Sequence, residues 1–214
     1  MMSLDRDELE WRWLGLWGRL HVAADRAPSL DRLIAEYDDP AREYHNLCHI
    51  DQCLKELDRV RDRCAHPDLV ELAIWYHDAV YDSTRHDNEE KSADLAAKDL
   101  RSAGLPESTI SAVVEFIHAT KHTHSPINPD AQILVDIDLS ILGQDPETFD
   151  AYERAIRQEY AHVEDNAFRA GRASILERFL ARPALFATPS MRDRYEHAAR
   201  QNLRRSLARL RHRA

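Results

Sequence analysis

Hydrophobic residues recur at helical spacing along nearly the whole chain, and this pattern predicts an all-α protein. In residues 46–64 the apolar positions recur every three or four residues, which places them on one face of a helix. These positions are Leu47, Ile50, Leu54, Leu57 and Val60. Residues 67–81 contain the almost wholly apolar run VELAIWYH. We expect this second segment to form a helix at the centre of the core.

Turn-forming residues divide the chain into roughly eight to ten helices. Prolines mark helix starts at Pro67, Pro106, Pro129 and Pro146, and Gly104 marks a helix end. The expected helices cover residues 5–23, 29–38, 46–64, 67–81, 89–103, 106–120, 129–143, 146–163, 166–181 and 190–211. Low-complexity segments, internal repeats and linkers are absent from the sequence. We therefore expect a single helical-bundle domain over residues 1–214.

Composition supports the helical fold, and the net charge argues against nucleic acid as a binding partner. Only 5 glycines and 9 prolines occur in 214 residues, which favours long helices over sheets. The 29 Lys and Arg against 38 Asp and Glu give a formal net charge of −9, and an acidic chain repels phosphate backbones. The basic C-terminal stretch RQNLRRSLARLRHRA is read as an amphipathic helix that packs through Leu203, Leu207 and Leu210. Nucleic acid is accordingly not an expected partner.

Three cysteines, Cys48, Cys53 and Cys64, form no CxxC motif. We read no signal peptide and no long apolar run, so the expectation is a cytoplasmic protein with reduced thiols and no membrane partner. The aromatic N-terminal segment LEWRWLGLWGRL is interrupted by charges and reads as a packing helix.

Histidines and aspartates interrupt the apolar helices at several places. His45 and His49 in YHNLCHI are four residues apart, and share a helix face if that helix begins by Tyr44. His77 and Asp78 in WYHDAVYD are adjacent, about 100° apart on a helix, among apolar neighbours. A buried carboxylate requires a cation or several hydrogen-bond donors. These pieces together indicate a metal site, although a single histidine on an apolar face is more often a hydrogen-bonded core residue.

Two further segments supply more candidate ligands. VDIDLSILG places Asp136 and Asp138 in a core-like pattern, and IHATKHTH contains His118, His122 and His124. Histidine nitrogens and carboxylate oxygens suit Mn²⁺, Fe²⁺, Co²⁺, Zn²⁺ or Mg²⁺. A set of two histidines and two aspartates leaves coordination positions for water and for a substrate oxygen, as metal-assisted hydrolysis requires.

The order His49, His77 and Asp78, then Asp138 resembles the HD-domain superfamily of metal-dependent phosphohydrolases, which have an all-α fold. The motifs cover about residues 42–143, and the helices of residues 145–212 are expected to pack on that core. The pattern RQEY…GR…ILERFL…ARQNL looks like one bacterial branch of the superfamily. YHNLCHIDQC is also similar to the opening motif of cyclic-nucleotide phosphodiesterases, which use a related helical metal site.

The resemblance implies roles for individual residues. His45 corresponds to a proton donor for the leaving oxygen. The implied metal ligands are His49, His77, Asp78 and Asp138, with Asp136 as the alternative to Asp138. His118 and His122 would supply a second metal ion, so one or two ions per chain are both compatible with the sequence. Many members also carry a Glu-Asp pair just after the doublet, where this chain offers only Asp82.

The expected activity is hydrolysis of a small-molecule phosphoester, with a nucleotide as the favoured substrate class, by a metal-activated water. Asp78 or Asp82 would hold or deprotonate the water. Arg42 and Lys121 are candidates to neutralise the phosphate. Asn46 either orients His45 or caps the following helix.

Two alternatives stay open at this point. One is a diiron oxygenase on the same fold, with a ligand set of His49, His77, Asp78, His118, His122 and Asp138. The other is a nucleotide-binding module without turnover. Arg157 and Tyr160 are read as part of a helical hairpin with surface ion pairs, rather than as substrate contacts.

Overall fold

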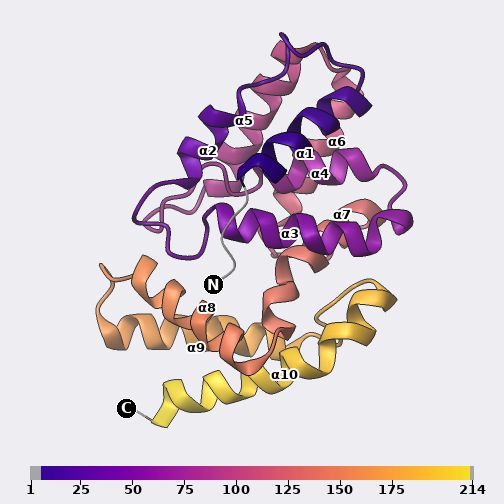
Figure 1. Cartoon of the computed structure of the whole chain (residues 1–214). Helices are drawn as coiled ribbons and strands as arrows, with labels where there is room; N and C mark the ends of the chain where they lie inside the picture. Colours follow the sequence, from indigo (N-terminus) through magenta and orange to yellow (C-terminus); the bar gives the residue numbers. More distant parts are fainter. Residues whose placement is uncertain (1–5, 213–214) are drawn as a thin grey trace. The chain divides into compact units, whose positions relative to one another are not determined.

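The computed structural model describes residues 6–212, and over this range the regular secondary structure is all helical, with ten α-helices, two 3₁₀ helices and no strand (Figure 1). The predicted all-α fold is confirmed. The elements are α1 (Arg6–Arg19), α2 (Leu30–Tyr37), α3 (Leu47–Val60), η1 (Arg61–Arg63), α4 (Pro67–Tyr76), α5 (Asn88–Ala103), α6 (Glu107–Ala119), α7 (Pro129–Asp138), η2 (Leu139–Gly143), α8 (Pro146–Glu159), α9 (Asp165–Ala181) and α10 (Pro189–His212).

Helix ends follow the local signals of the sequence. The side chain of Ser29 accepts a hydrogen bond from the backbone N–H of Arg32 at the start of α2. Asp145 accepts from the N–H groups of Glu147 and Thr148 at the start of α8. Gly104 ends α5 in the left-handed conformation, with φ of +84°, which glycine adopts without steric cost.

The helix predicted over residues 67–81 ends earlier, at Tyr76. Beyond it, the carbonyls of Asp78 and Ala79 accept hydrogen bonds from the Arg42 guanidinium, at 2.7 and 3.1 Å. The hydroxyl of Ser92 bonds to both the N–H and the carbonyl of Val80, at 3.1 and 3.2 Å. These side chains replace the backbone partners that a continuing helix would use, so His77 and Asp78 lie at a helix end rather than within a helix.

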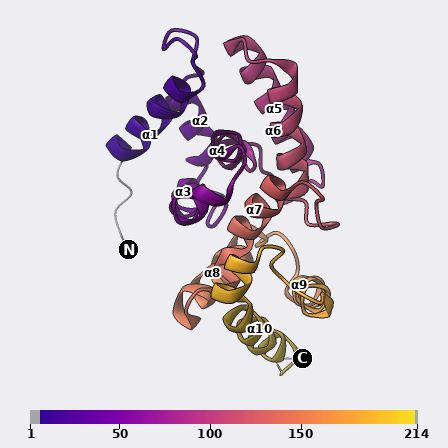
Figure 2. The same cartoon turned by 90° about the vertical axis from the view of Figure 1, so that its right-hand side faces the viewer.

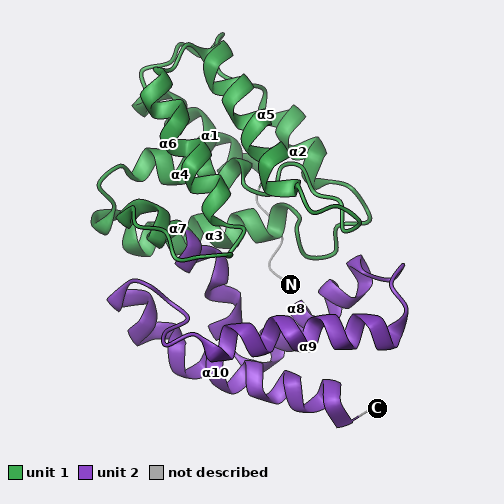
Figure 3. Ribbon diagram, turned by 180° about the vertical axis from the view of Figure 1, so that it is seen from behind, with its two compact units in different colours: residues 1–134 green, residues 135–214 purple. Residues whose placement is uncertain are grey.

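The chain divides into two compact units, one up to Leu134 and one from Val135, so that α7 begins in the first and ends in the second (Figure 3). In the first unit α4 contacts α1, α3, α5 and α6, and Figure 2 shows it surrounded by these helices. Residues 70–76 of α4 are all buried. The prediction that this apolar segment forms a central helix is confirmed for the first unit.

Aromatic side chains form the core between α1 and α4. Trp13 packs edge-on against Trp17 and Trp75, with ring centroids 5.4 and 5.2 Å apart. The indole N–H of Trp13 donates to the carbonyl of Pro28 at 3.0 Å. The aromatic N-terminal helix is thus a packing element. Among the described residues, no helix combines the length and the apolar character needed to cross a membrane.

In the second unit α10 packs against η2 and α9. A Cβ atom on Gly143 would lie 2.6 Å from the Cβ of Tyr195, so this close approach of η2 and α10 requires glycine. The buried Arg172 of α9 pairs with Glu153 of α8 and donates to the Tyr152 hydroxyl at 2.9 Å. Ser206 of α10 donates to the other oxygen of Glu153 at 2.5 Å. One partly buried ion pair therefore joins α8, α9 and α10.

Candidate metal centre

His49 and His77 meet in the interior of the first unit. His49 lies in the first turns of α3 and is 3% exposed, and His77 directly follows α4 and is 2% exposed. Their Nε2 atoms are 3.2 Å apart. Because the two residues are 28 positions apart in sequence, packing of α3 on α4 brings them together.

The hydrogen bond on the far side of the His77 ring fixes its orientation. Nδ1 of His77 lies 2.9 Å from the carbonyl oxygen of Ile74. A carbonyl oxygen only accepts, so Nδ1 carries a hydrogen. In the neutral ring Nε2 then holds the lone pair and faces Nε2 of His49. A backbone carbonyl that orients a ligating imidazole in this way is typical of metal sites.

Asp78 adds a carboxylate oxygen to the two nitrogens. Its Oδ2 atom is 3.1 Å from Nε2 of His77 and 3.5 Å from Nε2 of His49. Burial by itself raises the pKa of Asp78, but the imidazoles, His77 first and then His45 and His49, hold that pKa below its usual value. The carboxylate is thus ionised and is available as a ligand.

Asp138, the last residue of α7, completes the group. Its ligand atom and those of His49 and His77 all lie within 4.8 Å of one another. Helix α7 starts in the first unit, where the carboxylate of Asp130 accepts from the N–H groups of Ala65 and His66 at 2.8 and 2.7 Å. These two bonds tie the start of α7 to the segment that leads into α4.

Asp136, the alternative ligand, makes a different set of contacts. It is fully buried, and its carboxylate accepts from the N–H groups of Ala187 and Thr188, both at 2.7 Å, and from the Thr188 hydroxyl at 2.6 Å. Burial raises the pKa of Asp136 despite these bonds. This carboxylate anchors the segment that precedes α10, whereas Asp138 joins the histidines.

The distances between the donor atoms of His49, His77 and Asp78 fit the binding of one shared cation. Two nitrogens that each lie about 2.1 Å from one ion, at bond angles of 90–110°, are about 3.0–3.4 Å apart. The distances between Nε2 of His49, Nε2 of His77 and Oδ2 of Asp78 are 3.2, 3.1 and 3.5 Å. Nitrogen and carboxylate donors together favour Mn²⁺, Fe²⁺, Co²⁺ or Zn²⁺, since Mg²⁺ prefers oxygen.

His45 reaches the same region, although not from the helix that carries His49. Helix α3 begins at Leu47, and Asn46 caps it by accepting from the N–H of Cys48 at 2.9 Å. The condition for a shared helix face is not met, because this cap starts α3 at Leu47 and leaves His45 before the helix. The His45 ring instead stacks on Tyr81 with centroids 4.1 Å apart, and its centroid is 6.2 Å from that of His49.

The remaining predicted residues make contacts of their own. Asp82 is exposed and accepts from the N–H and the hydroxyl of Thr84, at 2.8 and 2.6 Å. Lys121 pairs with Glu90 and donates to the carbonyl of His86 at 3.1 Å. Arg42 donates to backbone carbonyls, as described above for the end of α4.

Neither His118 nor His122 belongs to the metal-capable group that the described residues form. His118 is exposed in the last turn of α6, and His122 lies in the loop that follows. Arg157 donates to the carbonyls of Tyr160 and Val163, at 2.7 and 3.2 Å, as the hairpin reading of that segment expects.

Sequence reasoning missed two neighbours of the site. Tyr81, against which His45 stacks, follows the doublet in a polar loop and gave no signal of its own. The buried Cys53 has its Sγ atom 3.7 Å from Nε2 of His49. Its spacing of four residues from His49 on one helix could have indicated this contact.

Comparisons with known protein families, with curated proteins and with solved structures found no match to this chain. What the site does must therefore be inferred from its own residues.

Proposed function

We propose that this protein is a metal-dependent phosphohydrolase of the HD-domain type, acting on a small-molecule phosphoester, with nucleotides as the favoured class. One observation carries the proposal. Donor atoms of His49, His77 and Asp78 lie at the mutual distances of ligands that share one ion, and a ligand atom of Asp138 lies within 4.8 Å of those of the two histidines. A divalent ion bound there would supply a hydroxide nucleophile near neutral pH and would polarise a phosphoryl oxygen.

Two side chains of the site would act on the water and on the leaving group. The pKa of Asp78 is held below its usual value, so its carboxylate is a weak base, and we assign it the holding of the attacking water by a hydrogen bond. The imidazole of His45 lies at the edge of the site and is only partly buried. Its stacking on Tyr81 holds the plane of the ring. We assign it the protonation of the leaving alkoxide, as the resemblance implies.

Charge neutralisation of the phosphate falls mainly to the bound ion. Lys121 is paired with Glu90, and the guanidinium of Arg42 already donates to backbone carbonyls. The diiron alternative requires ligands from His118 and His122, and these two residues lie outside the group that contains His49 and His77. The mononuclear hydrolase is thus the function that the contacts support best.

The test combines metal content with phosphate release. Protein purified without chelators is analysed by elemental mass spectrometry and screened on nucleoside monophosphates, cyclic nucleotides and nitrophenyl phosphates. We expect about one non-iron divalent ion per chain, and loss of both the ion and the activity in His77→Ala. His124→Ala is the matched control, since His124 is exposed and outside the group.

A second variant separates chemistry from metal binding. We expect His45→Ala to keep the ion and to lose about 10²–10⁴-fold in rate, most severely for poor leaving groups. No metal in the wild-type protein, even after addition, or full activity in His77→Ala would overturn the proposal. A content of about two iron ions per chain, together with oxygen consumption, would favour the diiron oxygenase instead.

A further inference from the structure

We propose that Arg42 is a positioning residue that clamps the turn carrying His45 onto the end of α4 that carries His77 and Asp78. The inference rests on the proposed function, because the residues it positions are those of the metal site. It changes the role expected from the sequence, in which Arg42 contacts the substrate phosphate.

The guanidinium of Arg42 joins two segments that are far apart in sequence. Nη1 donates to the carbonyl of Asp78 at 2.7 Å, and Nη2 donates to the carbonyl of Ala79 at 3.1 Å. Nη1 also lies 3.4 Å from the carbonyl of His45. Arg42 is 8% exposed, so these bonds form in the interior of the first unit, where losing them is costly.

Two aromatic rings hold the plane of this guanidinium. Its central carbon lies 5.4 Å from the ring centroid of Tyr37 and 5.7 Å from that of Tyr81. Tyr37 is itself fixed, because its hydroxyl donates to the carbonyl of Trp75 in α4 at 3.0 Å. Tyr81 is also the ring on which His45 stacks. Arg42 therefore acts on Asp78 through the backbone and on His45 through Tyr81.

The position of the clamp explains why an arginine is required. The carbonyls of Asp78 and Ala79 lie just beyond the end of α4, and their oxygens carry partial negative charge, which favours a cation there. Only a planar guanidinium presents parallel N–H groups to two successive carbonyls while stacking on rings. A lysine would keep the charge but would lose the second bond and the stacking.

The turn that carries His45 is bonded from within as well. The side-chain amide of Asn46 donates to the carbonyls of Arg42 and Glu43, at 3.1 and 3.0 Å, while its oxygen caps α3. The turn is thus a rigid unit, and the Arg42 guanidinium is the link from that unit to the end of α4.

The experiment compares Arg42→Lys and Arg42→Gln with wild type in two measurements. Calorimetric titration of the metal-free protein with Mn²⁺ or Co²⁺ reports the site without requiring turnover. We expect metal affinity to fall by about 10–100-fold in both variants. With a phosphoester that the wild type cleaves, kcat should fall while KM stays within a few-fold. Arg101→Gln is the control, because Arg101 is exposed and pairs only on the surface with Glu107.

Tyr81→Leu keeps the test decisive if an Arg42 variant does not fold. It removes the ring between Arg42 and His45 without removing a backbone donor, and we expect it to lower kcat with a smaller loss of metal affinity.

Wild-type metal affinity and kcat with a raised KM in Arg42→Lys would show a substrate contact and overturn the clamp. Unchanged behaviour of Arg42→Lys in both measurements would also overturn it. Failure of the wild-type protein itself to take up metal would instead overturn the proposed function.

Discussion

His77 illustrates how one hydrogen bond sets the chemistry of a residue. The carbonyl of Ile74 accepts from Nδ1 and so leaves Nε2 to face His49 and Asp78. That carbonyl lies in α4, three residues before His77, so the His77 ring is oriented by local structure. Asp78 follows in the chain, and the imidazoles around it, His77 first, hold the pKa of its carboxyl below the usual value.

The cysteines differ in reactivity at the residue scale. Burial, with the nearby Asp130 carboxylate adding to it, raises the pKa of Cys64 to about 12, whereas Cys48 is exposed. At pH 9 only about one Cys64 thiol in a thousand is ionised. We expect iodoacetamide at this pH to modify Cys48 and to spare Cys64, as measured by peptide mass spectrometry.

Folding raises the pKa of Cys64 from about 9 in the unfolded chain to about 12. The protonated thiol therefore makes its full contribution to the free energy of unfolding at pH values below about 9. That stability is lost as the pH rises from there towards 12. Labelling of Cys64 should accordingly begin only in that window, or in urea, which serves as the control. Equal labelling of Cys48 and Cys64 in the folded protein at pH 9 would contradict the prediction.

Sequence reasoning identified the residues of the metal group but not their supports. His49, His77, Asp136 and Asp138 all interrupt apolar helices, and only the family resemblance favoured Asp138 over Asp136. The structure groups His49, His77 and Asp138. The roles of Arg42 and Tyr81 arise from tertiary contacts between two turns. A single sequence gives no spacing rule for such contacts.

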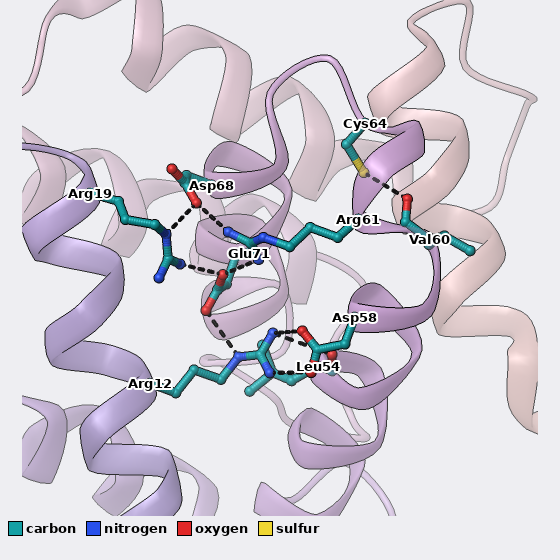
Figure 4. A network of polar contacts seen from close by, with 9 residues as sticks. All are labelled: Arg12, Arg19, Leu54, Asp58, Val60, Arg61, Cys64, Asp68 and Glu71. Carbon is teal, nitrogen blue, oxygen red and sulfur yellow. Dashed lines mark hydrogen bonds and ion pairs between the residues drawn. The ribbon is translucent and has the colours of Figure 1, made fainter.

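At the scale of the element, a buried carboxylate holds α4 in place. Glu71 of α4 is fully buried, and three arginines donate to it: Arg12 and Arg19 of α1, at 3.0 and 2.7 Å, and Arg61 of η1, at 2.6 Å (Figure 4). Asp58 and Asp68 balance the remaining charge of these arginines. The helix that presents His77 is thus tied to its neighbours six residues before that histidine.

Glu71→Gln should destabilise the first unit by about 2–4 kcal/mol, since it leaves three guanidinium groups, two of them partly buried, without their shared carboxylate. All four tryptophans lie between positions 11 and 75, so tryptophan fluorescence reports the unfolding of this unit alone. We expect a lower urea midpoint by fluorescence. Glu115→Gln, at an exposed position of α6, is the control, and an equal midpoint in both variants would argue against the network.

Helix positions were predictable because the apolar period and the caps are local. The helices that differ most, α1, α3, α4, α7 and α8, each end four or five residues before the predicted C-terminal end. Helix α7 gives way at Leu139 to the 3₁₀ segment that ends at Gly143. Position 143 must be glycine because a Cβ atom there would clash with Tyr195 of α10, which lies more than fifty residues later in the chain. A window of local sequence cannot contain such a partner.

At the scale of the whole molecule, metal binding should appear as added stability. A ligand that binds only the folded state contributes about 2.7 kcal/mol at a free concentration of 100 times its Kd. For a chain of this length that corresponds to a rise in Tm of roughly 5–10 °C. We expect Mn²⁺ or Zn²⁺ to raise the Tm of EDTA-treated protein by about this amount, measured by circular dichroism.

The same titration of His77→Ala provides the control, and we expect no comparable rise there. A shift of equal size in the variant would mean that the ion binds elsewhere on an acidic surface. The all-α class and its helix order could be predicted from the sequence. The division at Leu134 could not, because no change of composition or linker marks it inside α7.

Helix α7 carries three carboxylates, and each of them contacts a different part of the chain. Asp130 bonds to the backbone before α4, Asp136 to the backbone before α10, and Asp138 lies with the histidines. Inserting or deleting one residue would rotate all that follows by about 100° and shift it by about 1.5 Å. An insertion or deletion between Asp130 and Asp138 is therefore expected to separate Asp138 from the histidines, whereas insertions in the surface loops are expected to be tolerated.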